Sequence, residues 1–241
     1  MSEADAKRET SLAGKSVEYE IRRSADAAEP RIDVDIRGVQ VTLPEDSEED
    51  PDELLRENAM WVLEKKSKYD RHRQQAPDRA FEPGATFPYL GEDHTVVVEP
   101  GVRHDAVDGE IRLRQSAVTQ SSLKQVLENF YRTHAREHLA DRVDHYADEM
   151  GVEYKQIQLR NQRTLWGSCS TTGTLSLNWR LVMAPPEIID YVVIHELAHL
   201  IEANHTQEFW RIVGEYEAEY KQHSEWLEAN STTLIFSEAD L

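Results

Sequence analysis

The sequence predicts an α+β protein with a β-rich N-terminal region and a C-terminal region that combines strands with long helices. Three observations lead to this fold class. Segments in which apolar and polar residues alternate are concentrated before residue 118. Apolar residues at helical spacing run from about 119 to 150. A largely apolar helix then follows Pro185 and Pro186 and carries the segment 195–199. These patterns predict a boundary near 115–118.

The N-terminal region is expected to begin after a polar tail at residues 1–15, which is predicted to be disordered. A helix is expected from 52 to about 69, because apolar residues recur there on one side. The β-rich region as a whole covers residues 16–117. Strands are predicted where the alternation is clearest, at 17–21, 32–36, 39–43, 96–98 and 111–113.

The C-terminal region, residues 118–230, is predicted to hold the chemistry. Its long helix should end at Gly151, since glycine is the common residue just after a helix. Strands are expected at 154–159 and 174–179, before the histidine-bearing helix. A last helix is expected from about 207 to 228, with Thr206 as its N-cap. Residues 231–241 are taken as a C-terminal tail.

The segment His195-Glu196-Leu197-Ala198-His199 predicts a metal site. Residues four apart lie on one face of a helix, so His195 and His199 can bind one ion. Glu196 lies beside them and is the candidate base that takes a proton from a metal-bound water. Zinc is the expected ion, although imidazole ligands also accept cobalt, nickel or manganese.

A third ligand is expected shortly after this helix. Asn204 tolerates the left-handed conformation at a helix end, so the chain can turn there and bring His205 back to the metal. Glu202 and Glu208 are the alternatives for the same position. Two helical histidines and a third ligand leave one tetrahedral position open, which is the catalytic rather than the structural arrangement of zinc.

The charge of the chain limits its partners. The net charge of −19 argues against general nucleic-acid binding, which needs a basic face. Only eight of the 27 basic residues are lysines. An acidic, lysine-poor composition is typical of proteins that work in high salt, where ions screen the self-repulsion. We therefore interpret the composition as halophilic; the alternative is an ordinary acidic cytoplasmic protein.

The chain shows no membrane or secretion signal. No apolar run reaches the ~18 residues of a membrane span, and the polar N-terminus lacks the apolar stretch of a signal peptide. The single cysteine, Cys169, excludes an internal disulfide and a four-cysteine zinc ribbon. These features predict a cytoplasmic protein with no membrane partner. The sequence does not indicate an oligomeric state.

Several motifs together resemble the YgjP-like metal-dependent hydrolase family, a relative of the SprT-like zincins. The motifs are the run 160–170 with its Trp-Gly-Ser-Cys, Leu177-Asn178, the run 191–200, Asn204-His205-Thr206 and Phe209-Trp210. The resemblance implies a zincin-like (minigluzincin) metal domain. It also implies that His195, His199 and His205 bind the metal and that Glu196 is catalytic. SprT-type repair proteases often carry a zinc ribbon, which one cysteine cannot build.

The predicted chemistry is metal-assisted hydrolysis. Negative charge develops on the attacked group, and its candidate partners are Arg160, Arg163 and Asn178. The leading hypothesis is a zinc metallopeptidase acting on a peptide substrate. The alternative is a nucleoside triphosphate (UTP-type) pyrophosphohydrolase, because Arg160 and Arg163 suit bidentate phosphate contact and the resemblance implies such hydrolysis as well. A metal-stabilised binding module is a third reading, and the intact Glu196 argues against it.

Overall fold

The computed structural model describes residues 6–24, 27, 29–35, 38–75, 77–101, 103–162 and 165–237. It is a mixed α/β structure in which the chain divides into two compact units, Met1–Ala76 with Leu241 and Pro77–Asp240. Each unit has its own apolar core. We refer to them as the N-terminal unit and, after the metal site that the sequence predicts in it, the metal unit, and we describe each by itself.

The N-terminal unit contains a sheet with the strand order β1-β2-β4-β3. Its strands are β1 (Ala6–Leu12), β2 (Lys15–Ser24), β3 (Arg31–Asp35) and β4 (Gly38–Pro44). The outer pairs are antiparallel, and β2 runs parallel to β4. Two helices follow, α1 (Pro51–Glu57) and α2 (Ala59–Gln75). Their apolar side pairs Leu55 and Val62 with the buried strand residues Val41 and Leu43. The strands predicted at 17–21 and 39–43 are confirmed within β2 and β4, and the strand predicted at 32–36 is confirmed over residues 32–35, since residue 36 lies outside the described residues.

The predicted disordered tail is wrong for residues 6–15, because β1 occupies most of this segment; residues 1–5 lie outside the described residues. Ala13 and Gly14 have φ values of 47° and 82°, which is typical of the tight turns that join antiparallel strands. Thr10 and Leu12 alternate into the core, where Leu12 is fully buried. Because only these two described side chains of β1 are buried and most of its residues are polar, the sequence pattern does not predict this strand.

The metal unit begins with a second sheet of the same topology, in the order β5-β6-β8-β7. Its strands are β5 (Thr86–Tyr89), β6 (Glu92–Glu99), β7 (Asp105–Val107) and β8 (Glu110–Arg114). The strands predicted at 96–98 and 111–113 are confirmed within β6 and β8. The helices α3 (Gln115–Gln120) and α4 (Leu123–Met150) follow, and Gly151 ends α4 in the left-handed conformation, as predicted.

The predicted boundary near 115–118 does not coincide with the division of the structure, which falls at Ala76/Pro77. Phe87, Val96 and Ile111 of the second sheet share one core cluster with Leu127 and Phe130 of α4. Residues 77–117 therefore belong to the metal unit. The change from strands to helices in the sequence marks a change of secondary structure and not the edge of a core.

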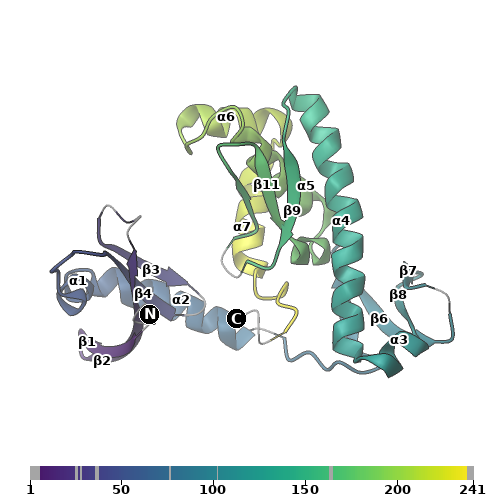
Figure 1. The fold of residues 1–241 in the computed structure, drawn as a ribbon, viewed down its shortest axis with the longest axis horizontal. Helices are drawn as coiled ribbons and strands as arrows, with labels where there is room; N and C mark the ends of the chain where they lie inside the picture. The colour runs from purple at the N-terminus through teal and green to yellow at the C-terminus, as the bar shows by residue number, and fades with distance from the viewer. Residues whose placement is uncertain are drawn as a thin grey trace. The chain divides into compact units, whose positions relative to one another are not determined.

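A third sheet, in the order β10-β11-β9, contacts the helix that carries His195. It consists of β9 (Gln156–Arg160), β10 (Gly167–Cys169) and β11 (Thr174–Asn178); β11 is parallel to β9 and antiparallel to β10. The short helix η1 (Trp179–Met183) leads to α5 (Pro186–Ala198). The long α4 runs beside β9 and α5 (Figure 1). Arg142 of α4 donates to both carboxylate oxygens of Asp190 on α5, at 2.6 and 2.9 Å.

The C-terminal segment differs from the prediction in two ways. The single last helix is two helices, α6 (Gln207–Tyr216) and α7 (Tyr220–Asn230). Residues 231–237 are not a tail, since Leu234 and Phe236 are each 1% exposed within the core of the metal unit. Arg79 donates to the carbonyl of Ile235 at 2.8 Å and holds this segment against the start of the unit.

Among the described residues, no helix combines the length and apolar character that crossing a bilayer requires.

Candidate metal centre

The helix α5 places the first two histidines of the predicted site. It begins with Pro186 at a position where proline is favoured, and most of its following residues are apolar and buried. His195 lies in its last turn and His199 is its C-cap residue. The chain then turns and starts α6, where the side chain of Thr206 caps the helix by accepting from the backbone N–H of Phe209 at 3.3 Å. His205 immediately precedes this cap.

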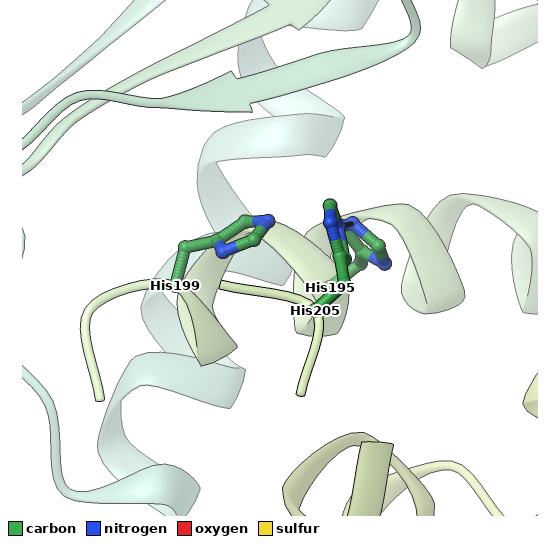
Figure 2. Close-up of side chains that lie close together, drawn as sticks. All are labelled: His195, His199 and His205. Atoms are coloured by element: carbon green, nitrogen blue, oxygen red, sulfur yellow. Dashed lines mark hydrogen bonds between the residues drawn. The ribbon is translucent and has the colours of Figure 1, made fainter. Parts of the chain in front are cut away.

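The structure brings His195, His199 and His205 together (Figure 2). One ring nitrogen of each lies within 4.8 Å of the others. The Nε2 atoms of His195 and His205 are 3.0 Å apart. Two nitrogens bound to one tetrahedral zinc would be roughly 3.3 Å apart, given Zn–N bonds of about 2.0–2.1 Å. The three imidazoles therefore fit a single divalent ion that prefers nitrogen ligands.

The alternatives for the third ligand are engaged elsewhere. Glu202 accepts from the backbone N–H of Asn204 at 3.2 Å through its Oε1. Glu208 forms an ion pair with Arg211 at 2.8 Å. Neither carboxylate belongs to the group of the three histidines. The geometry thus points to His205 as the third member of the cluster.

Burial keeps the helical histidines neutral. It lowers the pKa of His195 to about 4, and the neighbouring His199 and His205 act in the same direction. The pKa of His199 is also lowered, mainly by burial. A neutral imidazole has a free lone pair, which metal binding requires. The Nδ1 atom of His199 lies 3.3 Å from the carbonyl of Glu202, so an N–H there would donate to it and leave Nε2 for the metal.

Glu196 lies between the two helical histidines in sequence and is only 5% exposed. Burial raises the pKa of its carboxyl to about 8, and a divalent ion held by the flanking histidines would lower this pKa again and favour the ionised form. Its Oε2 has no hydrogen-bond partner among the described residues. A buried carboxylate oxygen without a partner is costly unless something else satisfies it. A water molecule or a bound ligand group would supply that partner.

The hairpin of β10 and β11 lies along the second half of α5. A Cβ atom on Gly167 would come within 2.6 Å of Glu196 Cγ, a distance that only glycine avoids. A Cβ atom on Gly173, in the turn of the hairpin, would lie 3.8 Å from Leu200 Cδ2. The sequence resemblance included Gly167 in its Trp-Gly-Ser-Cys motif, but local reasoning assigned it no role. Its contact with Glu196 provides one.

Asn178 was predicted to be a candidate oxyanion partner, but its side chain makes hydrogen bonds within the fold. Its side chain is fully buried, and its amide donates to the carbonyls of Gln162 and Leu165 at 2.6 and 3.2 Å. Its Oδ1 accepts from the backbone N–H of Arg180 at 3.1 Å. Both amide hydrogens are therefore used within the fold. Asn178 holds the segment that leads into β10.

The two predicted arginines are less informative. Arg160 is exposed at the end of β9 and donates to the side chain of Gln158. Arg163 lies outside the described residues. Sequence reasoning missed Arg180, which is 2% exposed and donates to the carbonyl of Gln162 at 2.8 Å. Its guanidinium lies 5.3 Å from the ring centroid of Trp166, so Arg180 supports the same segment as Asn178.

Comparison with known protein families shows which family the chain belongs to. The model of the YgjP-like metallopeptidase domain matches residues 28–230. The match supports the class of metal-dependent hydrolases, and the chain belongs to the YgjP-like family. The match begins in the N-terminal unit and ends at the last residue of α7. Membership implies a divalent metal, usually zinc.

Two solved structures are similar to part of the chain. The metallopeptidase zymogen abylysin of Pyrococcus abyssi is 26% identical, with a TM-score of 0.32, and the match covers 36% of this chain and 90% of that one. The metallopeptidase zymogen jannalysin of Methanocaldococcus jannaschii is 23% identical, with a TM-score of 0.36, and the match covers 39% and 96%. A comparison with curated proteins finds no match.

Proposed function

We propose that this chain is a zinc metallopeptidase in which His195, His199 and His205 bind the metal and Glu196 is the general base. The proposed domain, residues 118–230 together with the sheet β5–β8, is zincin-like. The proposal is carried by the convergence of three imidazoles and by Glu196, which lies between the first two of them in the sequence. Glu196 is buried, and its Oε2 has no hydrogen-bond partner among the described residues. A purely structural zinc site is closed by four protein ligands and has no use for such a base.

The residues of the site divide the work between them. Zinc, when bound, acidifies a coordinated water and polarises the attacked carbonyl group. The three histidines orient this ion at the end of α5. Glu196 accepts a proton from the attacking water and returns it to the leaving amine, which typically contributes 10²–10⁴-fold to the rate. Gly167 leaves the space in which the Glu196 carboxylate lies.

The alternative activity is pyrophosphate release from a nucleoside triphosphate at the same metal site. Its sequence support was the pair Arg160 and Arg163. Arg160 is exposed and pairs with Gln158, and Asn178 is occupied within the fold. None of these contacts favours phosphate over peptide. We therefore keep the peptidase as the proposed function and let one experiment compare the two.

The test compares Glu196→Gln with the wild type on a fluorogenic peptide library and on a panel of nucleoside triphosphates, at molar salt. The matched control is Glu187→Gln, which changes an exposed glutamate in the first turn of the same helix. Zinc content is measured for every protein. Peptide cleavage that falls about 100-fold or more in Glu196→Gln, and persists in Glu187→Gln, supports the proposal.

Two results would contradict it. Triphosphate turnover lost in Glu196→Gln, with no peptide cleaved by the wild type, would assign the alternative activity. A zinc-loaded wild type that is inert on both substrate classes would overturn the hydrolytic role of Glu196.

A further inference from the structure

His205 lies in a loop, whereas His195 and His199 lie on the helix α5 or at its end. His195 and His199 are fixed by the backbone of α5, and both are partly covered. His205 is exposed and lies in the loop between α5 and α6. A side chain at such a position has more rotamers available to it, and ordering it costs free energy when a metal binds. Something other than the local backbone must orient its ring.

A column of aromatic rings extends from His205 through Trp210 to Tyr220. The His205 ring stacks on Trp210, with centroids 5.7 Å apart and an interplanar angle of 25°. Trp210 stacks in turn on Tyr220, at 5.4 Å and 17°. Trp210 belongs to α6 and Tyr220 to α7. The column therefore connects the exposed ligand to two helices of the core.

The sequence of α6 makes room for this column. A Cβ atom on Gly214 would lie 3.3 Å from Cε1 of Tyr220, which is tighter than most real contacts of this kind. Glycine inside a helix is less favourable than alanine, because it loses more backbone freedom on folding. The close packing of the Tyr220 ring against residue 214 explains why a glycine occupies this helical position. Gly214 lets Tyr220 approach α6 closely enough to stack on Trp210.

We propose that Trp210 and Tyr220 are positioning residues that orient the imidazole of His205, so that metal affinity depends on the stack His205–Trp210–Tyr220. This inference rests on the proposed metal site. Tyr220 reaches His205 through Trp210, whereas Trp210 also lies 5.7 Å from the ring of His195. A substitution of Tyr220 therefore tests more directly whether the stack orients His205, because a substitution of Trp210 also changes the surroundings of His195.

The stack acts by pre-organisation. When the ring of His205 is already oriented, less rotamer freedom is lost on metal binding, and the apparent affinity rises. Removing either ring returns that freedom to His205 and leaves the ligand atoms unchanged. Partners that orient metal ligands typically change metal affinity by 10–100-fold when they are replaced. The same loss is expected here for Trp210→Leu and Tyr220→Leu.

The experiment measures zinc affinity by competition with a chromophoric chelator, the visible spectrum of the cobalt-substituted protein, and the melting temperature of the metal-free protein. The variants are Trp210→Leu, Tyr220→Leu and Tyr220→Phe. The control is Trp226→Leu, which removes a half-buried ring of the same helix α7 outside the stack. A double-mutant cycle adds Tyr220→Leu to His205→Ala.

We expect both Leu variants at positions 210 and 220 to bind zinc about 10–100-fold more weakly and to alter the cobalt spectrum. Tyr220→Phe keeps the ring and should retain wild-type affinity, and Trp226→Leu should lower only the melting temperature. In the His205→Ala background, Tyr220→Leu should cause no further loss. Folded Leu variants with wild-type affinity, or a full loss without His205, would overturn the inference. A wild type that binds no zinc would overturn the proposed function itself, and this inference with it.

Discussion

Gly167 of β10 lies directly against the carboxylate side chain of Glu196 on α5. A Cβ atom at Gly167 would come within 2.6 Å of Cγ and 2.7 Å of Cδ of Glu196. No positive φ requires glycine at this position, since Gly167 is absent from the residues in the left-handed region. The requirement is therefore steric, and it comes from a residue 29 positions later in the chain.

This contact leads to the first prediction. Gly167→Ala should displace the Glu196 side chain and lower kcat/KM for peptide cleavage by about 100-fold, because misplacing a catalytic group by about 1 Å has an effect of that size. Zinc affinity should remain at the wild-type level, since the histidines are not touched. Gly101→Ala is the control, because the nearest atom to its Cβ position is 3.9 Å away. Equal activity in the two variants would disprove the steric role of Gly167.

Metal removal provides the second prediction. A ligand that binds only the folded state increases the free energy of unfolding. For zinc this increase would be about 2.7 kcal/mol when the free zinc concentration is 100 times Kd. A chelator should therefore lower the melting temperature of the wild type and abolish its activity, and zinc should restore both. Calorimetry with and without chelator measures the shift. His205→Ala should show a much smaller shift in melting temperature. If neither zinc nor chelator changes the melting temperature of the wild type, the result would count against the metal centre.

The third prediction separates two roles for Asn178. The side chain makes hydrogen bonds to Gln162, Leu165 and Arg180 in a fully buried place. Asn178→Ala should lower the free energy of unfolding by about 2–4 kcal/mol, because it leaves several buried groups unpaired. Asn230→Ala, which removes one bond to the carbonyl of Trp226, should lower it by about 1 kcal/mol or less.

Denaturant unfolding measures these changes, and kcat is compared at a temperature where both variants are folded. An oxyanion role predicts the opposite pattern, a loss of about 10²–10³ in kcat with little change in stability. That result would contradict the assignment of Asn178 to the support of β10.

The fourth prediction concerns salt. With a net charge of −19, the folded chain repels itself, and ions screen that repulsion over a Debye length of about 3 Å at 1 M against about 10 Å at 0.1 M. The melting temperature should rise between 0.1 M and molar potassium chloride. Thermal unfolding across this range measures it, with sucrose as a neutral additive for comparison. A melting temperature that stays level or falls would reject the halophilic interpretation.

Much of the candidate site could be predicted from the sequence because its determinants are local. The four-residue spacing of His195 and His199 depends only on helical geometry, and the apolar residues before them predict the helix. Thr206 before Phe209 predicts the start of α6, and Gly151 the end of α4. These features follow from a few consecutive residues, where propensity and periodicity are informative.

Only the tertiary structure decided which segments share a core and which groups meet. The strand β1 contains few apolar residues, and the apolar residues of the packed segment 231–237 form one short run, so the burial of both segments depends on partners distant in the chain. The contact of Gly167 with Glu196 and the commitment of Asn178 to Gln162 likewise join residues from different elements. Local patterns determine which face of an element is apolar, whereas packing among elements determines what that face and its polar groups contact. The sequence by itself therefore determined the helix α5 and the three histidines that are proposed to bind the metal, and the fold decided how these residues are supported.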